Sequence, residues 1–67
     1  MLRIPDFTKP ELEHIIEYAN FTEQERILFD LRNDETPHER CAEILQVSPS
    51  TEYRINRRMI RKILKVI

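Results

Sequence analysis

A chain of 67 residues forms one domain with a thin core, which leaves little room for an enclosed active site, so we expect neither an enzyme nor a cofactor. The sequence contains no glycine, which disfavours a β-rich fold because tight hairpins use glycine at left-handed backbone positions. The net charge of −1 conceals an asymmetry: residues 1–52 hold five basic and all twelve acidic residues, whereas residues 53–67 hold six basic residues and no acid.

Two helices are predicted in the first half of the chain, after an arm (residues 1–7) that lacks helical periodicity and is expected to lie extended on the surface of the domain. Thr8 and Glu11 have the spacing of a capping box, in which the hydroxyl and the carboxylate satisfy free backbone N–H groups at a helix start. Thr22 and Glu25 form a second box of the same kind. Apolar residues follow each box at helical spacing. These signals predict helices over residues 9–19 and 23–32.

Two more helices are predicted in the second half. Thr36 and Glu39 have the spacing of a third capping box, with Pro37 at the first helical position. Ser48 and Pro49 are an N-cap and a first-turn proline, and no helix breaker follows them. These signals predict helices over residues 37–45 and 49–66.

The four helices predict an all-α domain over residues 1–67, a four-helix bundle without the strands of a winged fold. About three residues join the last two helices, which is typical of a helix-turn-helix with a long C-terminal recognition helix. Ala42 is small where the two helices approach, and Leu45 and Val47 are apolar on either side of the turn. Gln46 stands where glycine is usual, so a left-handed backbone at this position would cost free energy.

The predicted last helix concentrates positive charge. An acidic domain with one basic helix suggests that the helix meets a polyanion such as nucleic acid. The alternative is that the basic face folds back on the acidic part of the chain, and charge alone favours neither. The basic residues are Arg54, Arg57, Arg58, Arg61, Lys62 and Lys65.

Several short motifs occur in order along residues 21–67, about two thirds of the chain. They are Phe21-Thr22-Glu23-Gln24-Glu25-Arg26-Ile27-Leu28 with Leu31-Arg32, Cys41-Ala42-Glu43-Ile44-Leu45-Gln46-Val47-Ser48, Ser50-Thr51, and Arg57-Arg58 with Arg61-Lys62. In sequence and spacing they resemble region 4 of the sigma-70 family of bacterial transcription initiation factors, whose scaffold is shared by output domains of response regulators. The resemblance implies a small bacterial or phage-type regulator of transcription that binds specific sequences of double-stranded DNA.

The resemblance also implies which residues contact DNA, because the first turns of a recognition helix face the base edges. Arg54 is suited to a bidentate contact with guanine, a discrimination of about 1–3 kcal/mol. Residues farther along the helix are expected to contact phosphates, which supply affinity without sequence information. The set near the bases is Pro49, Ser50, Thr51, Tyr53 and Arg54, and the phosphate set is Arg57, Arg58 and Arg61.

Two residues depart from the pattern of the family. Glu52 stands where an aliphatic core residue is usual, and Asn56 is also polar near the inner face of the predicted helix. Either the helix is rotated slightly, with Ile55 and Met59 taking over the packing, or Glu52 and Asn56 have polar partners.

The other reactive side chains suggest no separate chemistry. Cys41 stands alone, so it forms no internal disulfide and is expected to be a buried, inert thiol. His14 and His38 have no partners at a ligand spacing, so we expect no metal site. No apolar run approaches the roughly 20 residues that span a bilayer, and the N-terminus lacks the apolar core of a signal peptide, so we expect a cytoplasmic protein without membrane contact.

The main alternative function is a protein–protein interaction module that keeps the helix-turn-helix scaffold without reading DNA. The acidic part of the chain would then meet a basic partner, or the scaffold would contact RNA polymerase or another regulator. A homodimer is a further possibility, through an apolar seam. Its candidate residues are Ile60, Ile63, Leu64, Val66 and Ile67.

Overall fold

Four α-helices and one 3-10 turn make up the part of the chain that a computed structural model describes, residues 2–67. No strand occurs among these residues, so the prediction of an all-α fold is confirmed for them. The elements are η1 (Ile4–Asp6), α1 (Lys9–Tyr18), α2 (Glu23–Asn33), α3 (His38–Leu45) and α4 (Pro49–Val66).

Side-chain caps begin three of the helices. The boxes predicted at Thr8 and Thr22 are both formed, because each hydroxyl accepts a hydrogen bond from the glutamate N–H three residues later and each glutamate accepts one from the threonine N–H. Ser48 caps α4 by accepting from the Thr51 N–H at 3.2 Å. Local sequence signals therefore account for where α1, α2 and α4 begin.

Two local predictions are wrong. The capping box predicted at Thr36 is absent, because Pro37 is the N-cap of α3 and no side chain caps that helix. The Thr36 carbonyl accepts hydrogen bonds from the Arg32 and Cys41 side chains, and the backbone bonding of α3 begins one residue later, where the Cys41 N–H donates to the Pro37 carbonyl. The N-terminal arm is not fully extended either, since residues Ile4–Asp6 form a 3-10 turn that buries Ile4 against the core.

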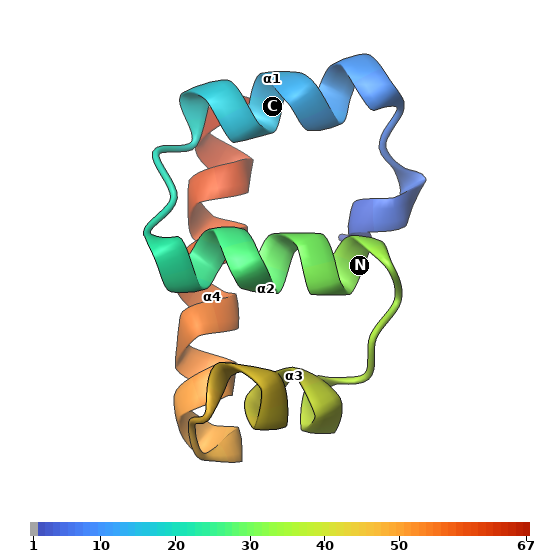
Figure 1. Ribbon diagram of the computed structural model, residues 1–67. Coiled ribbons are helices and arrows are strands. Elements are labelled where there is room, and N and C mark those ends of the chain that lie inside the picture. The colour runs from blue at the N-terminus through green and yellow to red at the C-terminus, as the bar shows by residue number, and fades with distance from the viewer. Residues whose placement is uncertain (1) are drawn as a thin grey trace.

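Helix α4 crosses the other three helices and packs against each of them. In Figure 1, α1, α2 and α3 lie one above another like rungs, and α4 runs along one side of all three. Its inward face carries Ile55, Met59 and Ile63, which are at most 4% exposed and share one core cluster with Leu28 and Phe29 of α2. The radius of gyration, 11.1 Å, is close to the value of about 11 Å expected for a compact domain of this length.

The connections between the α-helices use left-handed backbone without any glycine. Asn20, Glu35 and Gln46 have φ angles of 56°, 60° and 58°, one in each connection. For a residue with a Cβ atom this conformation costs roughly 1–2 kcal/mol. Gln46, which stands where glycine is usual, therefore bears the steric cost expected of a left-handed backbone at this position.

Candidate nucleic-acid interface

Glu52 lies on the buried face of α4 and has a polar partner there. It is 3% exposed, and its Oε2 lies 2.8 Å from Nδ1 of His38, the first residue of α3. Ile55 and Met59 pack inward beside it. The unusual glutamate is thus accommodated by a pair between α3 and α4, which the spacing of 14 residues conceals in the sequence.

A second buried carboxylate, Glu25, holds the C-terminal half of α4. Lys62 Nζ lies 2.6 Å from Glu25 Oε1 and 3.1 Å from the carbonyl oxygen of Asn20. Burial raises the pKa of the Glu25 carboxyl, but the hydrogen bonds from Lys62 and from the Thr22 N–H outweigh burial and bring this pKa below its ordinary value. The two carboxylates, Glu25 and Glu52, therefore fix α4 at two levels of the domain.

The remaining basic residues of α4 form one outward face. All are exposed, and none forms an ion pair within residues 2–67. Since an α-helix turns by about 100° per residue, they fall within an arc of about 100° opposite the buried stripe. We call these five residues the basic face: Arg54, Arg57, Arg58, Arg61 and Lys65.

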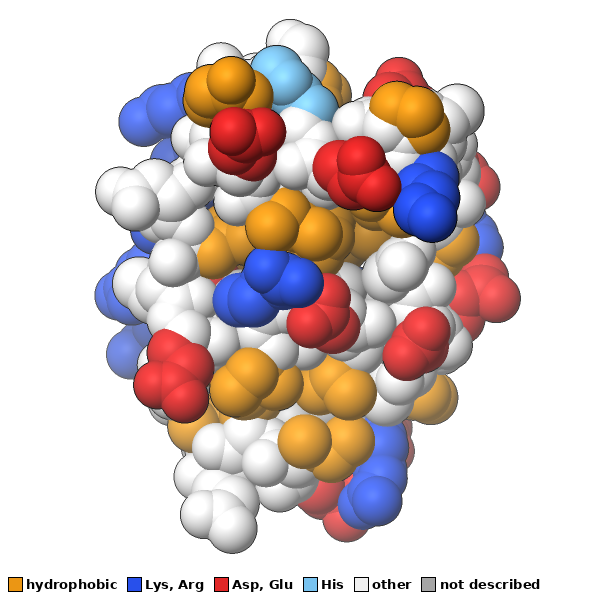
Figure 2. All heavy atoms as spheres, turned by 45° about the horizontal axis from the view of Figure 1, so that its top comes forward, with side chains coloured by type: hydrophobic (Ala, Val, Ile, Leu, Met, Phe, Trp, Pro, Cys, Tyr) orange, Lys and Arg blue, Asp and Glu red, His pale blue; other side chains and the backbone are white. Residues whose placement is uncertain are grey.

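The basic face lies along one side of the molecule and makes no ion pair with the other helices within residues 2–67. Figure 2 shows acidic and apolar side chains and a few basic ones interspersed over the near side of the molecule, while several Lys and Arg side chains follow the left edge, the side on which α4 runs in Figure 1. Among the basic residues of α4, Lys62 alone pairs with an acidic residue of another helix within residues 2–67. Lys65, which the sequence-based set of contacts omitted, belongs to the same exposed face.

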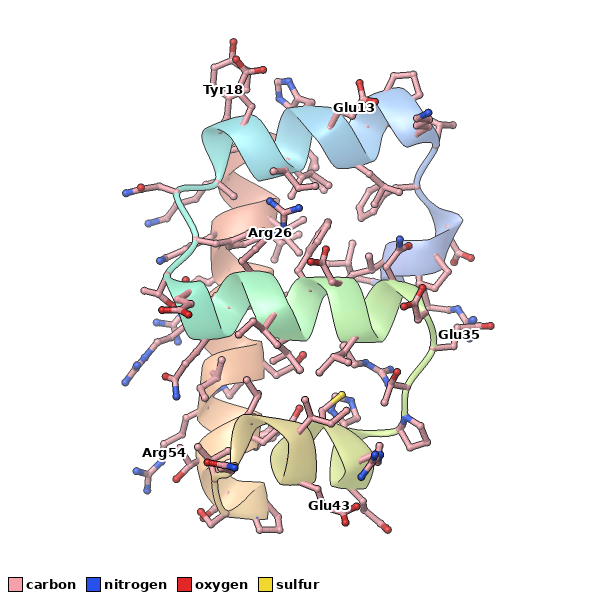
Figure 3. All side chains as sticks on the ribbon, viewed as in Figure 1. Glu13, Tyr18, Arg26, Glu35, Glu43 and Arg54 are labelled. Atoms are coloured by element: carbon pink, nitrogen blue, oxygen red, sulfur yellow. The ribbon has the colours of Figure 1, made fainter. Side chains whose placement is uncertain are left out.

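The first turns of α4 present most of the residues expected near the bases. Pro49, Ser50, Tyr53 and Arg54 are exposed, and Arg54 extends away from the helices in Figure 3. Thr51 differs, because it is half-buried and its hydroxyl accepts a hydrogen bond from Ser48 Oγ at 2.9 Å. The Thr51 hydroxyl therefore takes part in the cap of α4 and is less available to a ligand.

An aromatic ring lies beside one arginine of this surface. The Arg57 guanidinium carbon lies 6.0 Å from the centre of the Tyr53 ring, at the outer limit of a cation–π contact. Tyr53 is itself 57% exposed. Tyr53 and Arg57 therefore lie together on the exposed surface of α4.

The histidines and the cysteine have structural roles. His14 Nε2 lies 2.9 Å from the carbonyl oxygen of Val66, which joins α1 to the end of α4. Cys41 is fully buried, and burial together with the nearby Glu52 carboxylate raises the pKa of its thiol, which disfavours the reactive thiolate. Within residues 2–67, no group of three or more His, Cys, Asp and Glu side chains is arranged to hold a metal ion.

The apolar seam suggested for a homodimer is divided between the core and the surface. Ile63 is fully buried, and Val66 is half-buried and packs against the core. Leu64 and Ile67 are 58% and 60% exposed. Only part of the predicted seam is therefore accessible to another molecule.

Across residues 2–67, every helix is too short or too polar to cross a bilayer.

Comparison of the chain with protein-family models, curated proteins and solved structures finds no match in any of the three. The resemblance to region 4 of the sigma-70 family therefore rests on the short motifs of residues 21–67.

Proposed function

We propose that the protein binds double-stranded DNA, with α3 and α4 acting as a helix-turn-helix and α4 lying in the major groove. The observation that carries the proposal is the basic face: five exposed cationic side chains on one side of α4, none of them paired with an acid within residues 2–67. The connection of three residues between α3 and α4 has the length of the turn in this motif. The motifs of residues 21–67 favour a role in transcription regulation.

The basic face supports affinity through phosphate contacts. Each phosphate that a cation neutralises releases a counterion, and the logarithm of the binding constant then falls with the logarithm of salt concentration by about 0.9 per contact. With four or five phosphate contacts the slope would be about −3.5 to −4.5. The body of the domain carries an excess of acids, so the field of the molecule favours an approach to DNA with α4 foremost.

Sequence reading is assigned to the exposed N-terminal turns of α4. Arg54 and Ser50 carry groups that hydrogen-bond base edges, and Tyr53 adds an apolar ring with a hydroxyl. Thr51 contributes less because it is half-buried, whereas Ser50 is exposed, although the hydroxyls of both lie within hydrogen-bond distance of Ser48 Oγ. A single domain of this size covers about one half-site, so high specificity calls for a second DNA-binding unit or a polymerase partner.

Selection from a random duplex library at about 50 mM salt tests binding and finds the preferred site together. We expect an enriched sequence of a few base pairs, and fluorescence anisotropy on that duplex should show affinity falling steeply between about 50 and 200 mM salt. Failure to bind any duplex at low salt would contradict the proposal.

A protein–protein interaction module is the second candidate, favoured by one observation. Leu64 and Ile67 expose apolar surface beside the basic face, near the end of α4. Such a surface suits a protein partner, either a second copy of this chain or a regulator or polymerase with an acidic and apolar surface. Sedimentation analysis distinguishes the first case, because a homodimer dissociates when Leu64→Glu places like charges in the contact, whereas a protein that is monomeric at high concentration is not a homodimer.

A further inference from the structure

A cleft of about 340 Å³ lies where the N-terminal segment, the end of α2, the start of α3 and the middle of α4 meet. Its α4 residues, Asn56, Met59 and Ile60, lie outside the arc of the basic face. The cleft is therefore separate from the proposed DNA-binding surface. Its volume is at the small end of the range of about 300–1,000 Å³ in which proteins bind small molecules.

The floor of the cleft is apolar and belongs to the core. Ile4 and Met59 are 6% and 1% exposed, and Ile60 is half-buried beside them. These side chains come from the N-terminal turn and from α4, which are far apart in the sequence. A ligand with a compact apolar group would bury that group against surfaces already held by the packing of the domain.

The wall of the cleft carries polar groups with unused hydrogen-bonding capacity. The Asn56 side chain makes no hydrogen bond within residues 2–67. His38 is held by Glu52 through Nδ1, and its Nε2 has no hydrogen-bond partner among residues 2–67. Arg32 uses Nη1 for the Thr36 carbonyl and forms no ion pair within the described chain, so the rest of its guanidinium is available.

The charge balance of the cleft favours an anion. Glu35 is the one carboxylate among the residues that line it, and its Oε1 lies 2.6 Å from Nη2 of Arg3. Figure 3 shows Glu35 in the connection between α2 and α3, beside the N-terminal segment. Arg3 and Glu35 thus neutralise each other at the rim, which leaves Arg32 as the excess cation of the lining, while Glu52, which does not line the cleft, is paired with His38.

We propose that this cleft binds a small carboxylic acid with a compact apolar body. The carboxylate accepts hydrogen bonds from the guanidinium of Arg32 and the amide of Asn56, and the apolar body lies on Met59 and Ile60. The proposal gives Asn56 a role that DNA binding does not, since this polar side chain near the inner face of α4 lines the cleft and has no hydrogen-bond partner among residues 2–67. Charge-assisted hydrogen bonds to a guanidinium are the strong interactions that such a site needs.

Titration of the full chain with sodium benzoate, followed by ¹H–¹⁵N correlation spectra at constant ionic strength, tests the proposal without DNA. Its result is therefore independent of the proposed function. We expect saturable shifts of the backbone amides around the cleft, including Glu35, His38 and Asn56. Benzamide, which has the same shape without the charge, should bind at least about tenfold more weakly. Absence of saturable shifts, shifts spread over the whole surface, or equal affinity for benzoate and benzamide would overturn the proposal.

Two variants locate the binding groups. Arg32→Gln and Asn56→Leu should each weaken benzoate binding about tenfold, corresponding to the loss of a charge-assisted or neutral hydrogen bond. Arg26→Gln is the matched control, because it removes an arginine of the same helix that does not line the cleft. If Arg32→Gln loses the folded spectrum, Asn56→Leu alone decides the question, since leucine occupies the same wall without the amide. Unchanged affinity in Asn56→Leu, or an equal loss in Arg26→Gln, would contradict the site.

Discussion

His38 Nδ1 lies 2.8 Å from Glu52 Oε2, and this single contact joins the first residue of α3 to the first turn of α4. The carboxylate is 3% exposed, whereas the His38 side chain is half-exposed. A buried carboxylate needs a partner, because burial without one costs free energy. The pair therefore helps to determine the angle between the two helices on which the proposed DNA contact depends.

Replacing His38 and replacing Glu52 should change the free energy of unfolding by different amounts. His38→Ala leaves Glu52 without its partner and should lower the free energy of unfolding by about 1–3 kcal/mol. Glu52→Ile replaces the carboxylate by an aliphatic side chain, the type usual at this position in region 4 of the sigma-70 family. It should leave the free energy of unfolding unchanged or raise it, because no charge is then desolvated on folding. Urea denaturation of both variants measures the difference.

The double variant of His38→Ala and Glu52→Ile supplies the control. Once the carboxylate is gone, the histidine has no buried group to satisfy, so adding His38→Ala to Glu52→Ile should cost less than about 0.5 kcal/mol. An equal cost of His38→Ala in both backgrounds would show that His38 stabilises the domain by some other contact.

Lys62 should matter for stability and its neighbour Lys65 for DNA binding. Lys62→Met removes the ammonium that pairs with the nearly buried Glu25 and should lower the free energy of unfolding by about 1–2 kcal/mol. Lys65→Met removes an exposed, unpaired cation and should change stability by less than about 0.5 kcal/mol. In the DNA assay Lys65→Met should reduce the salt slope by about 1. Equal losses of stability in both variants would contradict the assignment.

Acid should weaken the fold through Glu25. Because the pKa of Glu25 in the folded chain lies below its ordinary value of about 4.3, its stabilising contribution is fully present above that pH and is lost as the pH falls through the folded-state pKa. Thermal unfolding between about pH 7 and pH 2 should show the Tm falling most steeply below about pH 4. Glu25→Gln should flatten this part of the profile, and a profile as steep as that of the original chain would argue against Glu25 as the cause.

The left-handed turn before α4 offers a stabilising substitution. Gln46 has φ 58° and ψ 44°, a conformation that glycine adopts without steric cost. Gln46→Gly should raise the free energy of unfolding by roughly 0.5–1 kcal/mol, since relief of the steric cost exceeds the added entropy of the unfolded chain. Gln46→Ala keeps the Cβ atom and should change stability little. If Gln46→Ala raised the free energy of unfolding as much as Gln46→Gly, the gain would come from loss of the glutamine side chain and not from relief of the steric cost at Cβ.

Arg54 and Arg58 should separate sequence reading from general affinity. Arg54→Ala should alter the sequences recovered by selection, at a cost of about 1–3 kcal/mol on the preferred site. Arg58→Ala should weaken binding to all duplexes alike and reduce the salt slope by about 1. Arg26→Ala, in which the lost arginine pairs with Asp30 on α2, should leave both properties unchanged. Uniform weakening in Arg54→Ala would remove it from the base-reading set.

The sequence by itself determined the helices, because their start signals act over three or four residues. Thr8, Thr22 and Ser48 cap the helices that they were predicted to cap, and Gln46 is left-handed at the expected turn. The same reasoning failed at Thr36, whose carbonyl is held by the side chains of Arg32 and Cys41, so that α3 begins one residue later with Pro37 as its N-cap. The basic face was also foreseeable, since helical periodicity alone places its residues on one side of α4.

The tertiary structure decided which polar residues of α4 have partners, because those partners lie far away along the chain. Glu52 meets His38 from α3, and Lys62 meets Glu25 and Asn20 across 37 and 42 residues. No local pattern encodes such pairs, since they form only when packing has brought the helices together and removed the carboxylates from water. As a result, Lys62 pairs with Glu25, whereas the other five cations of α4 are exposed and form no ion pair within residues 2–67.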